Sequence, residues 1–273
     1  MASDAHAHPF DLARRDGSAE TERRELGVAC AASAWHEEEF LFNEGLAADA
    51  ERDGGPEVVL CFGVHPQLPS AAGEPEGRAA ASLAFLRRLV AEKRIRAVGE
   101  AGFDLFAGGG TSFRETEEEQ EALFRAQLEL ARDASLPMVL HLRRAMHKAF
   151  AYRRELRGLP AVVFHSYSGT LAEAGALLKN GVNAFFSFGT VLLLNHKRAM
   201  EACALLSADR LLFETDAPYQ PLRGRDRSSW RDLRDVIAAA ARLREAAGSG
   251  AADPRGLEEI GDRNFRRAYG ERF

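Results

Sequence analysis

Short apolar runs recur along the chain, separated by longer amphipathic stretches. Most of the runs are continuous rather than alternating, which is typical of strands that are covered on both faces. Between the runs, residues such as Leu123, Ala126 and Leu130 recur at steps of three and four, the spacing of a helix face. The pattern predicts eight strands, at Ala5–Phe10, Leu26–Ser33, Val58–His65, Ile95–Phe103, Met138–Leu142, Ala161–His165, Ala184–Phe188 and Leu211–Glu214.

The order of the predicted elements indicates the fold class. Strands that alternate with helices favour parallel β–α–β units. Eight such units in 273 residues match the size of an α/β fold, the TIM (β/α)8 barrel, as a single domain over residues 1–273. A doubly wound open sheet is the alternative. The barrel makes a further demand, because functional residues of TIM barrels sit at the C-terminal ends of the strands.

Composition narrows the range of partners. With 28% charged residues and a net charge of −5, the chain has no global basic surface for nucleic acid, so a phosphate group has to be held by a local site. The three cysteines, Cys30, Cys61 and Cys203, lie far apart in apolar runs, which predicts buried reduced thiols and a cytoplasmic location. No apolar run reaches 18 residues, so we expect neither a membrane span nor a signal peptide.

Polar residues gather where the predicted strands end. A single histidine at a strand end usually has a structural role, but here five histidines and several carboxylates would converge at one rim of a barrel. Imidazole suits Zn, Fe, Ni and Cu, and carboxylates also suit Mg and Mn. We therefore predict a centre of two divalent metal ions that activates a water. The residues at strand ends are His6, His8, His65, Glu100, Asp104, His141, Arg143, His165, Glu214 and Asp216.

Six short motifs carry a family resemblance: HxH, GVHP, GExGxD, HxR, HxYSG and ETDAPY, in that order. Each motif is weak alone, but the ordered set closely resembles the TatD family of metal-dependent deoxyribonucleases, within the metallo-dependent hydrolase superfamily. The resemblance runs from Asp4 to about Gly270. It implies a TIM barrel that cleaves phosphodiester bonds, as a 3′→5′ exonuclease acting on single-stranded DNA or 3′ ends with Mg²⁺, Mn²⁺ or Zn²⁺.

The resemblance also implies roles for individual residues. The first metal ion would have the ligands His6, His8, Glu100 and Asp216. The second would have Glu100, His141 and His165, so that the two carboxylate oxygens of Glu100 bridge both ions. Asp216 would also accept a proton from the attacking water, which makes Asp216 and Glu100 the expected catalytic residues.

Four further residues are expected around the metal ions. His65 and Arg143 would hold the substrate phosphate, for which Arg offers two planar donors. An ion pair between Arg143 and a nearby carboxylate is an equally open interpretation. Asp104 and Glu214 would orient metal ligands.

The chain departs from the family pattern at two places. HLRRA has Arg144 where family members commonly carry Asp. The segment QPLRGRDRSSWRDLRD after ETDAPY holds five Arg against three Asp, and only Arg223-Gly224 remains of the family's usual Arg-Gly-x-x-Asn-x-Pro. This segment should lie at the catalytic rim. It either contacts a phosphate backbone or forms salt bridges at the start of a helix, the interpretation we favour.

Two other functions compete with the nuclease. An amidohydrolase-like enzyme would cleave a small amide or lactone on the same barrel, but many binuclear members of that group bridge their metals with a modified Lys on the fourth strand. Here Glu100 takes that place and the nearest lysine, Lys93, precedes the strand. A barrel that binds a partner without catalysis is disfavoured because every expected ligand is present. The sequence does not decide the identity of the metal, the preference for DNA or RNA, or the polarity of digestion. It also leaves the oligomeric state open, a monomer included.

Overall fold

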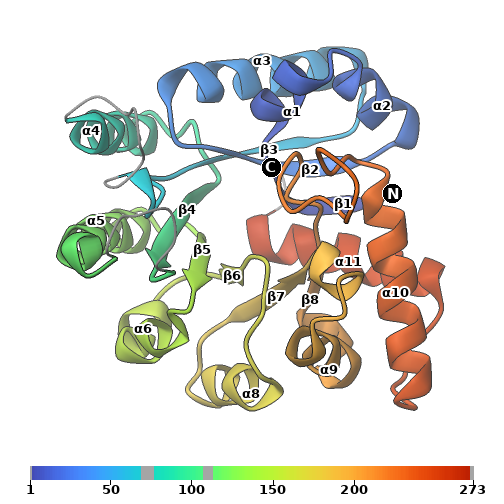
Figure 1. Ribbon diagram of the computed structural model, residues 1–273. Coiled ribbons are helices and arrows are strands. Elements are labelled where there is room, and N and C mark those ends of the chain that lie inside the picture. Colours follow the sequence, from blue (N-terminus) through green and yellow to red (C-terminus); the bar gives the residue numbers. More distant parts are fainter. Residues whose placement is uncertain (1, 69–76, 107–112, 271–273) are drawn as a thin grey trace.

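The computed structural model describes residues 2–68, 77–106 and 113–270. Its centre is a parallel sheet in which each strand neighbours the next along the chain, in the order β1 to β8. Figure 1 shows the helices arranged around the outside of these strands. The strands are β1 (Ser3–Ala7), β2 (Ala29–Ala34), β3 (Val58–Phe62), β4 (Ala97–Asp104), β5 (Met138–Arg143), β6 (Val162–Phe164), β7 (Ala184–Phe188) and β8 (Leu211–Phe213).

The helices up to α9 lie in the connections between successive strands, and α10 and α11 follow the last strand. They are α1 (Pro9–Arg15), α2 (Ala19–Leu26), α3 (Glu37–Asp53), α4 (Arg78–Ala91), α5 (Phe113–Asp133), α6 (Met146–Ala151), α7 (Arg153–Leu156), α8 (Leu171–Lys179), α9 (Lys197–Leu205), α10 (Asp232–Ala246) and α11 (Pro254–Tyr269). Two 3₁₀ helices, η2 (Thr190–Leu192) and η3 (Ala208–Arg210), lie on either side of α9.

Backbone hydrogen bonds between the first strand and the segment after the last one close the sheet. The His8 amide donates to the Ala217 carbonyl at 2.8 Å, and the Asp216 amide donates to the His6 carbonyl at 3.0 Å. The predicted TIM barrel is therefore confirmed, and the open doubly wound sheet is excluded. The closure also places the residues after β8 directly beside the end of β1.

All eight predicted strands are present, with small differences at their ends. The first run, predicted as Ala5–Phe10, leaves the sheet after Ala7 because Pro9 begins helix α1. Proline is well suited to the first turn of a helix, where its missing N–H has no intrahelical partner. His8 is thus the residue between strand and helix rather than part of the strand.

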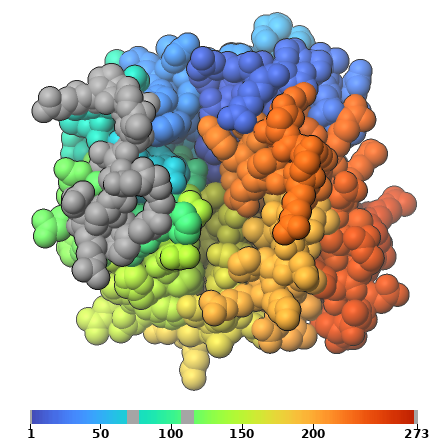
Figure 2. Space-filling view, in the orientation of Figure 1, coloured from blue at the N-terminus to red at the C-terminus, as the bar shows by residue number. Residues whose placement is uncertain are grey.

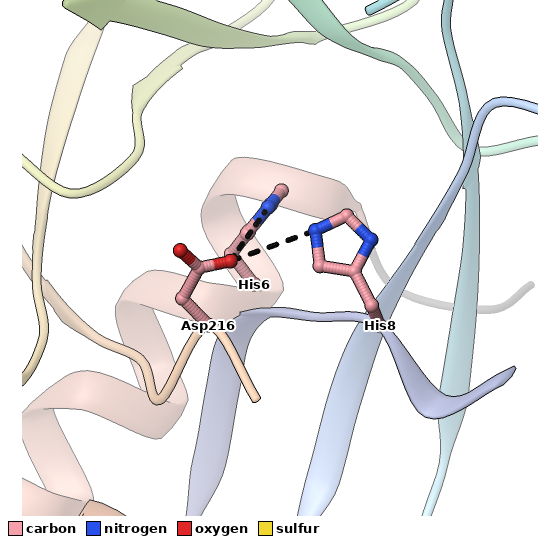
Figure 3. Close-up of side chains that lie close together, drawn as sticks. All are labelled: His6, His8 and Asp216. Atoms are coloured by element: carbon pink, nitrogen blue, oxygen red, sulfur yellow. Dashed lines mark ion pairs between the residues drawn. The ribbon is translucent and has the colours of Figure 1, made fainter. Parts of the chain in front are cut away.

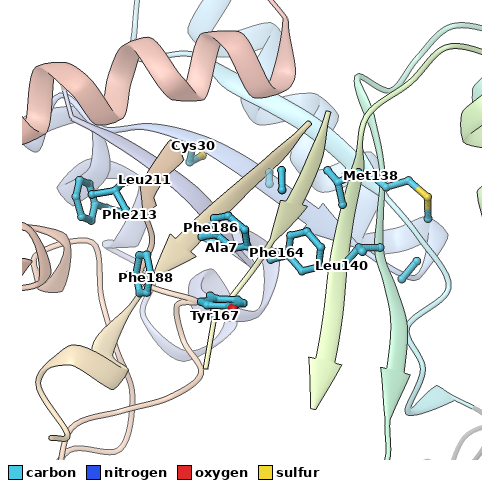
Figure 4. Packing of buried hydrophobic residues seen from close by; sticks show 14 of the residues in the cluster. Ala7, Cys30, Met138, Leu140, Phe164, Tyr167, Phe186, Phe188, Leu211 and Phe213 are labelled. Atoms are coloured by element: carbon cyan, nitrogen blue, oxygen red, sulfur yellow. The ribbon is translucent and has the colours of Figure 1, made fainter. Parts of the chain in front are cut away.

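Two hydrophobic layers stabilise the barrel. Residues on the outer faces of the strands, among them Met138, Leu140, Phe164, Phe186 and Phe213, pack against the helices (Figure 4). The alternate residues form a separate cluster inside the barrel, in which small side chains such as Ala5, Ala31 and Ala97 are common. The strands are buried on both faces, which explains their continuous apolar runs.

Helix α11 closes one end of this interior. Phe265, Ala268 and Tyr269 join the inner cluster, and the Tyr269 hydroxyl donates to the Ala5 carbonyl at 2.6 Å. The Ser3 hydroxyl also donates to Asp262 of α11 at 2.6 Å. Because these contacts lie near the N-terminal ends of the strands, only the C-terminal ends are left to form a site.

Cys30, Cys61 and Cys203 are buried and form no disulfide, as predicted. Burial raises the pKa of each thiol to about 12, which keeps it protonated and unreactive. Among the helices that the structure describes, none combines the length and apolar character needed to cross a lipid bilayer.

Candidate active site

Close packing of β4 on β5 brings the predicted ligands of these two strands together. Gly102 has φ +147°, and a Cβ atom at this position would lie 2.1 Å from the His141 carbonyl oxygen. A Cβ on Gly99 would likewise lie 2.5 Å from the Val139 carbonyl oxygen. Glycine is the residue that permits this approach. The glycines of the GExGxD motif therefore place Glu100 against His141.

Glu100 lies at the centre of the strand-end histidines. Its Oε1 atom is 2.7 Å from His165 Nε2 and 3.3 Å from His65 Nε2, and it also contacts His141 Nδ1. Its Oε2 atom is 3.2 Å from His6 Nε2. The two oxygens of one carboxylate thus face two different groups of imidazoles, which is the geometry a bridging ligand requires.

His6, His8 and Asp216 form the second part of the cluster. The two imidazole rings are 5.0 Å apart and converge on the carboxylate from the end of β1 (Figure 3). Asp216 Oδ1 lies 3.6 Å from His6 Nε2 and 3.5 Å from His8 Nε2. The backbone of Asp216 is held at φ +55° just after β8, beside the closing hydrogen bond to His6.

The side chains of this cluster shift one another's pKa values. Burial opposes ionisation of Glu100, but the surrounding imidazoles, His165 first, outweigh burial and hold its pKa well below the usual range. Burial disfavours the charged form of His8, but its interactions with Asp216 and Glu100 prevail and raise its pKa to about 10. Burial lowers the pKa of His6 instead. The carboxylates therefore create a strong preference for positive charge at this place.

Unsatisfied buried atoms indicate that the positive charge can be a metal ion. Among the described residues, His6 Nε2, His165 Nδ1 and Glu214 Oε2 are buried without any hydrogen bond. His6 Nε2 faces the carboxylates of Glu100 and Asp216 without a hydrogen bond to either, as expected of a metal ligand. Three groups in the described chain have ligand atoms within 4.8 Å of one another: His6, His8 and Asp216; His6, Glu100 and His165; His65, Glu100 and His141.

The third group includes a residue for which the sequence predicts another role. His65 is predicted to hold the substrate phosphate, yet its Nε2 lies 3.3 Å from Glu100 Oε1, close enough for both to be ligands of one metal ion. Its other ring nitrogen, Nδ1, accepts a hydrogen bond from the Gln67 amide at 3.1 Å. His65 therefore has the position of either a metal ligand or a phosphate contact.

Asp104 and Glu214 lie where residues that orient metal ligands are expected. Asp104 Oδ2 is 3.3 Å from His141 Nε2, and Glu214 Oε1 is 3.5 Å from His165 Nδ1. Asp4 supports His6 in a different way, because its carboxylate accepts hydrogen bonds from the His6 amide and from the amide and hydroxyl of Thr215. Burial raises the pKa of Asp4 to about 8, although these hydrogen bonds oppose the rise.

A cavity of about 530 Å³ opens above the cluster. Figure 2 shows this face of the molecule, hollowed near its centre between the orange segment after β8 and the green segments of β4 and β5. Arg143 lines the cavity and is half exposed, with its guanidinium 3.7 Å from Asp104 Oδ2. Arg143 can therefore both pair with Asp104 and face a phosphate in the cavity, so the two interpretations of this residue are compatible.

The arginine-rich segment after β8 is tied down by salt bridges. Arg225 pairs with Asp232 at the start of α10. Arg227 lies 2.8 Å from Asp16, and Arg231 pairs with Glu22 of α2. The favoured interpretation, a salt-bridged start of a helix, is confirmed for Arg225 and Arg231 at the start of α10, whereas Arg227 pairs with Asp16 just after α1.

Several cavity residues were not predicted. Gln220 donates from Nε2 to Asp216 Oδ2 at 2.7 Å and to Ser166 Oγ at 2.8 Å. The aromatic side chains of Trp35, after β2, and Tyr219, after β8, also line the cavity. Tyr219 and Gln220 directly follow ETDAP, so the strand-end rule could have found them. Trp35 lies two residues beyond the predicted second strand and directly before His36, so the same rule extended by two residues could have found it.

Comparisons with known proteins support the family that the order of motifs suggests. A family model described as TatD related DNase matches residues 3–270. The chain is 33% identical over 219 residues to the "3'-5' ssDNA/RNA exonuclease TatD" of Cronobacter sakazakii, covering 76% of this chain and 75% of that protein. Its match to the protein of the same name in Pantoea ananatis, 38% identical over 139 residues, spans about half of each protein, 49% and 50%.

A solved structure shows the same architecture. The crystal structure of YjjV, a TatD homologue from Escherichia coli K12, superimposes with a TM-score of 0.79 at 26% identity, over 99% of this chain and 98% of that one. Fold, order of motifs and sequence similarity over nearly the whole chain agree with one another. The chain belongs to the TatD-related DNase family of metal-dependent hydrolases.

Proposed function

We propose that this protein is a metal-dependent exonuclease that removes nucleotides from the 3′ ends of single-stranded DNA or RNA. The observation that supports it most is the cluster around Glu100, in which one buried carboxylate faces strand-end histidines on both of its oxygens beneath an open cavity. The polarity and the polynucleotide substrate come from the names of the TatD relatives.

The residues present fit two divalent ions, Mg²⁺, Mn²⁺ or Zn²⁺. One ion would be held by His6, His8, Glu100 and Asp216, and the other by Glu100, His141 and His165, whose side chains contact one another in pairs. When bound, such ions lower the pKa of a coordinated water and offset the charge of a phosphoryl group. Mixed imidazole and carboxylate ligands are compatible with each of these metals.

The protein's own groups would complete the chemistry. Asp216 would accept the proton of the attacking water at a carboxylate oxygen. Burial opposes its ionisation, but His8 and the other nearby imidazoles prevail and lower its pKa, so the carboxylate is in the ionised form that can accept a proton. Glu100 would hold the histidines that face its two oxygens in fixed positions relative to one another. Arg143, which lines the cavity, and His65 would hold the scissile phosphate.

The first test is cleavage of a 5′-labelled single-stranded DNA oligonucleotide, with Mg²⁺, Mn²⁺ and Zn²⁺ in separate reactions. We expect a ladder that shortens from the 3′ end and disappears with a chelator and in Asp216→Asn. A matched control is Asp226→Asn, because Asp226 is 83% exposed in the segment after β8 and outside the cluster.

The same experiment separates the competing functions. Intact DNA in every reaction, with metal shown to be bound, would disprove the nuclease and transfer the proposal to an amidohydrolase-like enzyme that acts on a small amide or lactone. Lys93 argues against that alternative, because it lies before β4 and outside the cavity, while Glu100 occupies the strand. Failure to bind any metal would favour a barrel that binds a partner without catalysis.

Two further features belong to the proposal. We take residues 1–273 as one catalytic barrel domain, since α11 at the end of the chain packs into the interior formed with β1. We also place the protein in the cytoplasm, because its three buried cysteines are free thiols and free thiols persist in reducing compartments.

A further inference from the structure

Arg143 and Arg144 form a cationic cluster at the edge of the cavity. Of the described residues that line the cavity, Arg143 is the one lysine or arginine. Arg144 follows it directly and is exposed, with its backbone held at φ +56° just before α6. This is the position at which the sequence departs from the Asp that is common in the family.

Phe106 gathers the two guanidinium groups into one patch. The ring centre of Phe106 lies 3.9 Å from the Arg143 guanidinium carbon and 4.6 Å from that of Arg144. Phe106 itself is 37% exposed, so part of its ring faces solvent beside the two guanidinium groups. Stacking on an aromatic ring restrains a guanidinium group while leaving its N–H donors free at the rim.

The patch carries unbalanced positive charge. Arg143 has Asp104 at 3.7 Å, but Asp104 also serves His141 and Gln67. Within the described chain, no carboxylate forms an ion pair with Arg144. Two like charges are thus held together on one ring with a single, shared counter-charge, and such an arrangement favours a polyanion that approaches along the rim.

We propose that Arg144, held on the Phe106 ring beside Arg143, binds the phosphate next to the scissile one in a polynucleotide. This inference rests on the proposed function, because Arg143 would contact the scissile phosphate at the cavity and Arg144 lies outside it on the same ring. A guanidinium group pairs with a phosphate whatever the neighbouring base is, so the contact we propose is to the sugar–phosphate chain. Arg144 is a specificity-determining residue: it makes the enzyme favour substrates with two or more phosphodiester bonds.

The test compares dTpT, which has one phosphodiester bond, with dTpTpT, which has two. In the wild-type protein we expect kcat/KM to be up to about fivefold higher for dTpTpT, the upper end of the range for an exposed ion pair. In Arg144→Ala and Arg144→Asp this ratio should fall toward one, and Arg144→Lys should keep part of it. The matched control is Arg255→Ala, because Arg255 is 90% exposed on α11 at the opposite end of the barrel.

Binding provides a readout that does not need turnover. Anisotropy of a labelled dT15 is measured with the Asp216→Asn protein over a series of KCl concentrations, with and without Arg144→Ala. Removing one phosphate contact should reduce the slope of log affinity against log salt by about 0.7 and weaken binding equally for dA15 and dT15.

The outcomes distinguish this inference from the proposed function. If both substrates are cleaved and Arg144→Ala keeps the ratio and the salt slope, the inference is wrong and the nuclease stands. If neither substrate is cleaved but Arg144→Ala still lowers the salt slope, the nuclease is wrong and the polyanion contact stands. If neither cleavage nor a change in slope is seen, both are wrong.

Discussion

Gln220 holds the carboxylate of Asp216, and its replacement should slow the reaction. Its Nε2 donates to Asp216 Oδ2 at 2.7 Å, while Oδ1 of the same carboxylate faces His6 and His8. The Gln220 backbone is itself fixed, because the Thr190 hydroxyl donates to its carbonyl at 2.8 Å. Gln220 therefore determines which Asp216 oxygen faces the histidines.

The size of the effect follows from the burial of this hydrogen bond. Asp216 is 7% exposed at the floor of the cavity, so water can only partly replace a lost donor. A hydrogen bond to a charged group contributes about 1.5–3 kcal/mol, which corresponds to roughly 10- to 150-fold in rate. Loss of a residue that orients a metal ligand has a similar range, about 10- to 100-fold. We expect Gln220→Leu to lower kcat about 10- to 100-fold and to change KM little.

The assay is steady-state cleavage of the labelled oligonucleotide, with metal content measured on the same samples. Gln220→Glu is the size-matched variant: it keeps the shape but puts a second carboxylate against Asp216, so it should be at least as impaired as Gln220→Leu. Thermal unfolding checks that both variants fold. A kcat within twofold of wild type in Gln220→Leu, at equal metal content, would refute the positioning role.

Three further predictions concern the cluster and its supports. Glu100→Gln should bind at most one metal ion per chain, because the shared carboxylate is lost; two ions per chain by elemental analysis would contradict the bridging role. Gly102→Ala should lower the free energy of unfolding by more than about 2 kcal/mol, since its Cβ would lie 2.1 Å from the His141 carbonyl oxygen, and a denaturant midpoint equal to wild type would show that the backbone can shift. Burial raises the pKa of Glu39 from the usual 4.5 to about 7, against the opposing hydrogen bond from the Trp35 amide. Its ionisation therefore destabilises the fold, and wild type should lose up to about 3 kcal/mol relative to Glu39→Gln as pH rises from 4.5 to 7; a constant difference across that range would be inconsistent with this.

Local pattern in the sequence was sufficient for the barrel and for the members of the cluster. Strands buried on both faces produce continuous apolar runs, so all eight were predictable from hydrophobicity alone. A parallel barrel places all C-terminal strand ends at one rim, so the sequence alone could predict that His6, Glu100, His165 and Asp216 lie together. The motif order then identified the family.

Only the tertiary structure decided how these residues contact one another. Which Glu100 oxygen faces which histidine, that His65 lies within reach of Glu100, and that Gln220 holds Asp216 depend on the register of strands far apart in the chain. In the arginine-rich segment, Arg227 and Arg231 pair with acidic residues about two hundred positions away, Asp16 and Glu22. Composition gives the number of charged residues, but which of them form ion pairs depends on the distances between their side chains. For residues far apart in the chain, packing sets those distances.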